Sequence, residues 1–305
     1  MYFSICIPTY NRKYILSRAL KSLENQTFKD FEVIVVDDGS TDDTAAFMDK
    51  YIESTKMNVR YFYKNNGGKH TALNLGIKNA KGMFFVILDS DDIFSEDCLE
   101  FFYNKSKMIN KSEDICGIIA RCSHMDTRKM IGKPFPKDGF ITSYLDVHFG
   151  SGLSLFHTGY SDCLEAIKTE IMKKYSWPET IKTKFIPEDY VTDQIGMKYK
   201  LLGFNKAVEY KEYFTDGITK NQEEYKKENI DGYLLKYIWN VKNLFQYDEI
   251  GLLAKFRISY QYFYGCTLKS SKKIDDTKLL FPYNLIKYCL PVMNFIKNNL
   301  RKINV

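Results

Sequence analysis

The chain has 305 residues, of which 45% are hydrophobic and 27% charged, a composition that excludes a disordered protein and predicts a folded core. The net charge of +6 is uneven, because residues 220–305 carry 15 Lys and Arg against 8 Asp and Glu. The seven cysteines contain no CxxC pair, which argues against a zinc site or a disulfide framework and predicts reduced, mostly buried thiols.

The first residues lack a basic region followed by an apolar run, so we expect no signal peptide and a cytoplasmic protein. The early apolar runs are also shorter than the roughly 20 residues that a spanning helix needs.

The first 120 residues alternate short apolar runs, typical of strands buried on both faces, with segments of helical spacing. Repeated units of this kind imply a mostly parallel α/β sheet with right-handed crossovers. In chain order we predict strands at Phe3–Pro8, Phe31–Val36, Val59–Tyr63, Met83–Leu88 and Ile115–Ala120, and helices at Tyr14–Leu23, after a cap at Ser40 or Thr41, and at Lys69–Ala80.

The second half of the chain is less regular. It predicts loops and short strands over residues 123–160, and helices over Cys163–Lys174, from Pro187 to about Lys200, and from Gln222 to about residue 270. A last apolar segment, Leu279–Leu300, is interrupted by two prolines, so we expect it to pack or to lie at a membrane interface.

Two acidic clusters follow predicted strands. Asp37 and Asp38 come after the second strand, and Asp89, Asp91 and Asp92 come after the fourth. Ligands of open α/β sheets bind beyond the carboxyl ends of the strands, and crowded carboxylates repel one another unless a cation lies among them. Because oxygen ligands suit Mg²⁺ or Mn²⁺ bound to phosphates, the residues alone predict a metal–nucleotide crevice. One such cluster by itself would be explained by turns and helix caps.

Four segments, in this order and spacing, resemble family 2 glycosyltransferases: Ile5–Arg12 (ICIPTYNR), Val33–Asp42 (VIVVDDGSTD), Asn66–Gly76 (NGGKHTALNLG) and Leu88–Asp92 (LDSDD). The strong similarity covers residues 1–100, and a weaker one continues to about residue 220. The resemblance implies the α/β GT-A fold, a Rossmann-like sheet flanked by helices. Residues 1–100 would bind the nucleotide-sugar and 101–219 the acceptor, followed by a helical, basic and aromatic region over 220–305.

The resemblance also assigns roles by position. Asp92 would be the main ligand of a Mn²⁺ or Mg²⁺ ion, and Asp91 would share the metal or contact ribose. UDP is the expected nucleotide, with GDP and TDP left open. The nucleotide-sugar donor would lie against Pro8, Thr9, Tyr10, Arg12, Asp38, Lys69, His70, Asn74, Asp89 and Asp91.

Inversion at the anomeric carbon, also implied by the resemblance, requires a base that takes the proton of the acceptor hydroxyl. Glu188 and Asp189 are the candidates. Two subgroups of the family align differently here and disagree about which of them is the base; we favour Asp189. The Gln-x-x-Arg-Trp motif of processive synthases is absent, since neither Trp177 nor Trp239 follows an Arg. We therefore expect transfer of a single sugar, in the synthesis of a cell-surface polysaccharide such as capsule.

The basic tail points to an anionic partner surface. Because a saccharide acceptor in such a pathway is expected to be lipid-linked, the tail would hold the protein peripherally at the inner face of the cell membrane. A solvated helical face is the other interpretation. No nucleic-acid-binding module is recognised, so we expect no nucleic acid partner.

Two other functions stay open at this stage. A nucleotidyltransferase that forms nucleotide-sugars would share a similar sheet, but it usually has a glycine-rich loop where this chain has Pro8 to Arg12. A catalytically inactive nucleotide-binding or scaffold module would have the same fold. The intact Asp38, Asp91 and Asp92 argue against it.

Overall fold

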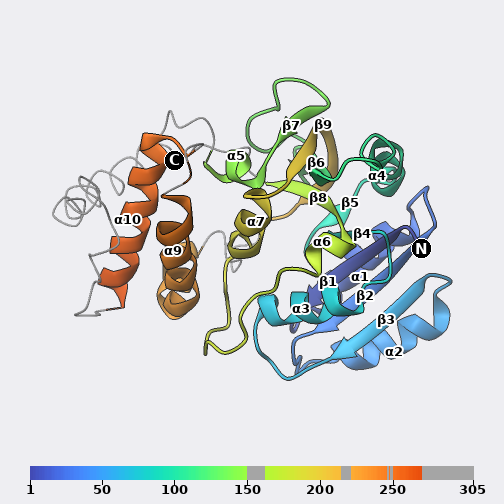
Figure 1. Ribbon diagram of the computed structural model, residues 1–305. Coiled ribbons are helices and arrows are strands. Elements are labelled where there is room, and N and C mark those ends of the chain that lie inside the picture. The colour runs from blue at the N-terminus through green and yellow to red at the C-terminus, as the bar shows by residue number, and fades with distance from the viewer. Residues whose placement is uncertain (150–161, 214–220, 246, 248–249, 270–305) are drawn as a thin grey trace.

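The computed structural model describes residues 1–149, 162–213, 221–245, 247 and 250–269 (Figure 1). A nine-stranded mixed sheet forms its centre, in the order β3-β2-β1-β4-β8-β6-β9-β5, with β7 paired to β9. The strands are β1 (Phe3–Thr9), β2 (Phe31–Asp37), β3 (Asn58–Tyr63), β4 (Phe84–Ile87), β5 (Ile93–Phe94), β6 (Ile115–His124), β7 (Phe140–Thr142), β8 (Cys163–Lys168) and β9 (Lys200–Lys211).

The first four strands along the chain form the parallel sheet that the sequence predicted. Because successive side chains of a strand point to opposite faces, each fully buried strand feeds two cores. Ile5 and Ile7 of β1 pack with helices α1 (Lys13–Glu24), α2 (Thr44–Ser54) and α4 (Cys98–Ser106). Cys6, between them, packs with α3 (Lys69–Asn79), α6 (Thr169–Met172) and α7 (Asp189–Gly196) on the other face. The sheet is therefore covered by helices on both faces.

One predicted helix is wrong. Residues Cys163–Lys168 form strand β8, inserted antiparallel between β4 and β6, and only a short helix follows it. The local sequence has good helix formers, but Leu164, Ala166 and Ile167 are buried in the sheet. Pairing with two neighbouring strands thus outweighs local helix propensity.

The cap expected for α2 also differs. Ser40 and Thr41 contact Asn11 instead, through Asn11 N to Ser40 Oγ (2.8 Å) and Thr41 N to Asn11 Oδ1 (2.7 Å). The carboxylate of Asp42 accepts the Thr44 N–H at 3.0 Å at the start of the helix. Two loops that follow β1 and β2 are thereby tied together beside the sheet edge.

The helices expected after Gln222 are present in the described part of the chain: α8 (Gln222–Glu228), α9 (Ile230–Leu244) and α10 (Leu252–Leu268). Figure 1 shows α9 and α10 side by side at the end of the molecule away from β2 and β3. They share a third core with the short helix α5 (Tyr144–Phe149). The predicted boundary at residue 219 and the segment Leu279–Leu300 lie outside the described residues.

Two further expectations concern membrane spans and thiols. In the described residues no helix has the length and hydropathy to cross a membrane. The six cysteines in that part are free thiols, and five of them are buried, as predicted. Cys289 lies outside it.

A buried ion pair connects β2 to β3. Glu32 is fully buried, and its carboxylate accepts bonds from Ser4 Oγ (2.7 Å), Arg60 Nε (2.9 Å) and the Lys81 N–H (2.8 Å). Arg60 therefore neutralises the Glu32 carboxylate, which also holds the turn before β4 through the Lys81 N–H.

Replacing Arg60 alone would leave that carboxylate buried without a counter-ion. We expect Arg60→Met to lower the free energy of unfolding by about 3–5 kcal/mol in urea denaturation. The double variant Arg60→Met/Glu32→Gln should lose clearly less, because the amide oxygen still accepts from Ser4 and Lys81. Equal losses in the two variants would show that the uncompensated charge is not the cause.

Candidate functional site

A cleft of about 620 Å³ opens where β1, β2 and β4 end. A larger hollow of about 1030 Å³, beside α1 and β5, contains none of the predicted site residues and is not the candidate. Of the residues predicted to bind the donor, those that line the 620 Å³ cleft are Pro8, Thr9, Tyr10, Arg12, Asp38, Lys69, Asp89 and Asp91.

Asp38 is held rigidly in the cleft wall. Its Oδ1 accepts from Lys64 Nζ (2.7 Å) and the Gly67 N–H (2.9 Å), and its Oδ2 accepts from the Gly68 N–H (2.6 Å). Gly68 has φ +99°, and a Cβ there would collide with the backbone carbonyl of Lys184. Only glycine therefore lets this loop close around the carboxylate. By contrast, the adjacent Asp37 is fully buried beneath the cleft.

The second acidic cluster has the chemistry of a divalent metal site. Ligand oxygens of Asp89, Asp91 and Asp92 all lie within 4.8 Å of one another. This all-carboxylate oxygen set suits Mg²⁺ or Mn²⁺ rather than a metal that prefers sulfur or nitrogen. These three side chains thus offer the carboxylate oxygens that the predicted Mn²⁺ or Mg²⁺ ion requires as ligands.

Each of these three carboxylates is paired with a different cation. Asp91 Oδ2 lies 2.6 Å from Arg12 Nη1, and Asp89 Oδ1 lies 2.5 Å from Lys69 Nζ. Asp92 Oδ2 lies 2.7 Å from Nζ of Lys211, at the end of β9. The cations come from three separate places in the chain, so only the folded protein assembles them.

Negative charge still exceeds positive charge in this region. Burial raises the pKa of Asp92 to about 8, opposed by Lys211 and reinforced by Glu209 and Asp89. Burial raises the pKa of Glu165 to about 8 as well, reinforced by Glu188 and Glu209. A divalent cation would relieve this repulsion, because a nearby positive charge favours the ionised form of a carboxyl group.

Glu188 and Asp189 separate at the start of α7. Glu188 faces the cleft, because its Oε1 lies 2.6 Å from Nζ of the lining residue Lys69. Asp189 belongs to another cluster, where it pairs with the buried Lys236 of α9. Burial opposes ionisation there, but Lys236 and His148 lower the pKa of Asp189. The geometry thus runs against our preference for Asp189 as the base.

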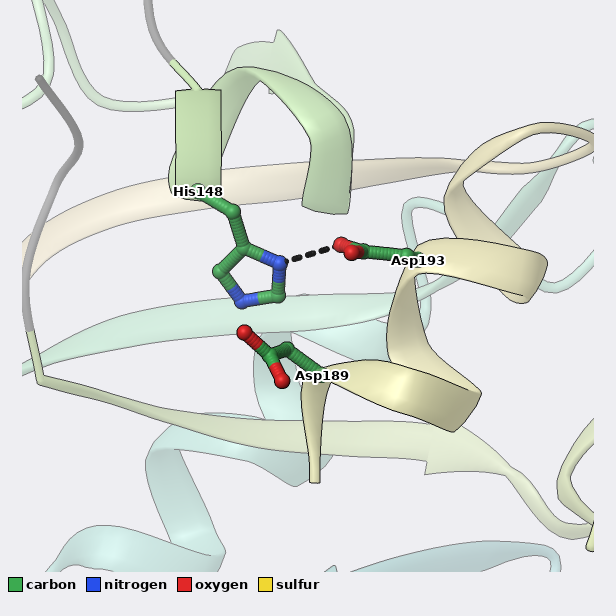
Figure 2. A group of neighbouring side chains, drawn as sticks. All are labelled: His148, Asp189 and Asp193. Atoms are coloured by element: carbon green, nitrogen blue, oxygen red, sulfur yellow. Dashed lines mark hydrogen bonds and ion pairs between the residues drawn. The ribbon is translucent and has the colours of Figure 1, made fainter. Parts of the chain in front are cut away.

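This other cluster joins α5, α7 and α9. Figure 2 shows the imidazole of His148 pointing between the carboxylates of Asp189 and Asp193. His148 Nδ1 lies 2.6 Å from Asp193 Oδ1, and Asp193 is fully buried. Lys236 and Arg257 supply positive charge, so the group forms a polar connection between α7, which packs on the sheet, and the helices α5 and α9.

Two other predicted donor residues lie behind the cleft. The Asn74 side-chain amide donates to the Trp177 carbonyl and to Glu179, both at 2.8 Å, and accepts the Trp177 N–H at 3.0 Å. These bonds hold α3 against the segment before α7. His70 is 2% exposed, and burial lowers its pKa, which favours the neutral ring. Both side chains support the wall instead of lining it.

Sequence reasoning missed Lys211, Glu209, Lys64 and Tyr225. Lys64 and Tyr225 lie in no recognised motif and reach the site only through folding. For the other two a signal existed: Glu209 and Lys211 are two residues apart on one strand and therefore share a face. Two charged residues at that spacing, next to the buried Val208, indicate that one face of the end of β9 points to a polar site.

Comparison with known proteins gives relatives over about a third of the chain. An uncharacterized glycosyltransferase of Rickettsia felis is 45% identical over 97 residues, which cover 32% of this chain and 16% of that protein. The poly(ribitol-phosphate) beta-N-acetylglucosaminyltransferase TarS of Staphylococcus aureus is 38% identical over 102 residues, covering 33% of this chain and 18% of TarS. The matched segments thus span less than a fifth of either relative.

Solved structures match nearly the whole chain and show the same fold. The crystal structure of S. aureus TarS superposes with a TM-score of 0.59 and 18% identity, over 96% of this chain and 53% of that one. A mannosyltransferase of Pyrobaculum calidifontis, in complex with GDP-Man and Mn²⁺, superposes with a TM-score of 0.57 and 15% identity, over 95% and 84%. The mixed sheet flanked by helices is thus the GT-A fold that the sequence predicted.

The sequence profile described as "Glycosyl transferase family 2" matches residues 4–160, which include β1, the Asp38 loop and the three clustered aspartates. This match covers more than half of the chain and includes most of the residues that line the cleft. The chain belongs to glycosyl transferase family 2.

Proposed function

We propose that the protein is an inverting, metal-dependent glycosyltransferase that moves one sugar from a nucleotide-sugar to a saccharide acceptor. The observation that carries this is the cleft itself, in which the Asp38 loop lies near Asp89 and Asp91, two lining members of a cluster that Asp92 completes, in a family 2 chain. UDP-sugars are the preferred donor class. TarS residues 1–349 have been crystallised with UDP-GlcNAc, and the GDP-Man complex of the Pyrobaculum calidifontis mannosyltransferase keeps GDP as an alternative.

The nucleotide-sugar donor would lie across the cleft, with its nucleobase at one end and its sugar at the other. Pro8, Thr9 and Asp38 would hold the nucleobase at the ends of β1 and β2. Asp91 and Asp92 would hold Mn²⁺ or Mg²⁺, which when bound neutralises charge on the departing diphosphate. Arg12 and Lys69 line the same wall and would bind phosphate oxygens after exchanging their carboxylate partners.

The acceptor's proton would be taken by Glu188. This carboxylate is held at the cleft by Lys69, which also contacts Asp89 of the metal cluster. Asp189 is the alternative, although it is occupied by Lys236 on the other side of the same helix start. Loss of a general base typically lowers a rate by about 10²–10⁴-fold.

Donor binding should depend on both the metal and Asp92. In calorimetric titrations with UDP and Mn²⁺, we expect Asp92→Ala to weaken binding by at least about tenfold, because the ion loses a carboxylate ligand. EDTA should have a similar effect on the unmodified protein. Asp43→Ala removes an exposed carboxylate next to the first cluster and is the matched control.

If UDP, GDP and TDP all failed to bind the folded protein with Mn²⁺ present, the inactive scaffold would become the better account. Binding that EDTA leaves unchanged would retain the donor site but overturn its dependence on metal.

The identity of the base is tested by a pair of isosteric variants. We expect Glu188→Gln to lower turnover by about 10²–10⁴-fold while nucleotide binding is retained. Asp189→Asn should reduce thermal stability more than turnover, because Lys236 loses its partner in a buried setting. The reverse pattern in single-turnover assays would make Asp189 the base.

The proposal also includes the acceptor and a membrane location. A lipid-linked saccharide of cell-surface polysaccharide synthesis, capsule included, would bring its acceptor end to the cleft. The basic tail would hold the enzyme peripherally at the inner face of the membrane. Support for the tail comes from charge alone, since most of its basic residues lie outside the described part of the chain.

Vesicle sedimentation tests the tail directly. Each basic residue near an anionic surface contributes about 1 kcal/mol, so neutralising five of them should weaken binding to anionic vesicles by at least about tenfold. Unchanged binding would remove the membrane from the proposal. The tail variant replaces Lys272, Lys273, Lys297, Arg301 and Lys302 with Gln, and the control variant replaces the exposed Lys50, Lys78, Lys81, Lys107 and Lys111.

A further inference from the structure

Lys211 is the most deeply placed cation of the metal cluster. Its ammonium lies 2.7 Å from Asp92 Oδ2 and 3.2 Å from Glu209 Oε2, and its side chain is 19% exposed. The Asp92 side chain is 6% exposed, and its other oxygen meets only the Glu212 N–H, at 3.3 Å. Lys211 is therefore the one side-chain partner of Asp92 in the described residues.

The other two pairs of the cluster lie nearer to solvent. In the Arg12–Asp91 pair the side chains are 30% and 24% exposed, and in the Lys69–Asp89 pair 24% and 32%. Water can more readily replace a lost partner there, because these side chains are partly exposed. Water cannot readily replace Lys211 at Asp92, because that side chain is only 6% exposed. Loss of this ion pair therefore has the larger effect on the cluster.

A divalent ion and the Lys211 ammonium cannot both occupy Asp92 Oδ2. Like charges that close repel each other strongly in a partly buried setting, and the metal carries twice the charge of the ammonium. Metal binding at Asp92 must therefore displace the ammonium. The displaced group needs another anion. Glu209 lies beside it, and the next residues along the chain, Glu212 and Tyr213, line the cleft in which a diphosphate would bind.

We propose that Lys211 is a built-in counter-ion of the metal site, which occupies Asp92 in the metal-free protein and couples metal binding to donor binding. The idea rests on the proposed function, since it takes Asp92 to be a metal ligand. Without nucleotide, the metal competes with Lys211 and binds weakly. With a nucleoside diphosphate bound, the released ammonium gains a phosphate partner, so metal and nucleotide strengthen each other's binding by the same factor.

Lys211 is a positioning residue in this scheme. It also explains how an acidic pocket stays folded before any metal arrives, because it holds Asp92 and Glu209 together across the end of β9. The mutual strengthening requires no movement of the sheet, only an exchange of partners by one long side chain.

The test measures Mn²⁺ binding by electron paramagnetic resonance of the free ion, with and without UDP. For Lys211→Met we expect Mn²⁺ to bind at least about tenfold more tightly than to the unmodified protein when UDP is absent, because its competitor is gone. UDP should then add little, whereas in the unmodified protein it should tighten Mn²⁺ binding. Lys206→Met removes a lysine of the same strand that pairs with Asp97, and it should change neither value.

Lys211→Met leaves Glu209 and Asp92 without a cation, so its metal-free form could lose structure. The double variant Lys211→Met/Glu209→Gln removes one of these charges and should show the same tightening, and Mn²⁺ should raise the melting temperature of both variants more than that of the unmodified protein. Lys211→Arg keeps the counter-ion and should keep weak Mn²⁺ binding.

Three results would overturn the idea. One is unchanged or weaker Mn²⁺ affinity in both Met variants, while the unmodified protein still binds Mn²⁺ with UDP. Another is an equal effect of UDP on Mn²⁺ affinity with and without Lys211. If no folded form bound Mn²⁺ or UDP at all, the proposed function would fail together with this inference.

Discussion

The rest of the site depends on one electrostatic constraint, which is the crowding of carboxylates at the carboxyl edge of the sheet. Asp89, Asp91, Asp92 and Glu209 converge there on the ends of β4 and β9. Such a group is stable only if cations share it, and three basic side chains do. The repulsion that would destabilise the metal-free pocket would also favour binding of a divalent ion, because a nearby positive charge stabilises ionised carboxylates.

The peptide between Glu188 and Asp189 divides two charged groups with different roles. On one side Lys69 joins Glu188 to the cleft. On the other, Lys236 of α9 and His148 of α5 engage α7 through Asp189 and Asp193. Helix α7 is thus positioned from both ends of the molecule. A change in the packing of α9 would therefore alter the position of Glu188, because Glu188 directly precedes Asp189, which pairs with Lys236 of α9.

Glycines serve this arrangement where backbone must approach backbone. Gly68 is the clear case, because its positive φ and the nearby Lys184 carbonyl leave no room for a side chain. The loop that it forms gives Asp38 two backbone N–H donors, so the position of this carboxylate is held by the backbone, whereas Asp89 and Asp91 are paired with long basic side chains.

Several features could be predicted because their causes are local. The continuous apolar runs around Ile5 and Val35 require burial on both faces, which predicts the parallel strands that are found. Acidic residues directly after such strands must meet at one edge, so Asp38 and Asp89 could be placed together from their positions in the chain alone. By contrast, Cys163–Lys168 has the composition of a helix, and only the gap between β4 and β6 makes it a strand.

The sequence by itself determined the sheet's parallel half, the position of the cleft and the carboxylates that surround it, because strand periodicity and chain order suffice for these. Tertiary structure alone decided which cation meets which carboxylate. Nothing local links Lys211 to Asp92 across 119 residues, or separates Glu188 from Asp189 into different charge clusters. Ion pairs act over a few ångströms in space and carry no periodicity along the chain, so only the folded arrangement of strand ends and helix starts reveals them.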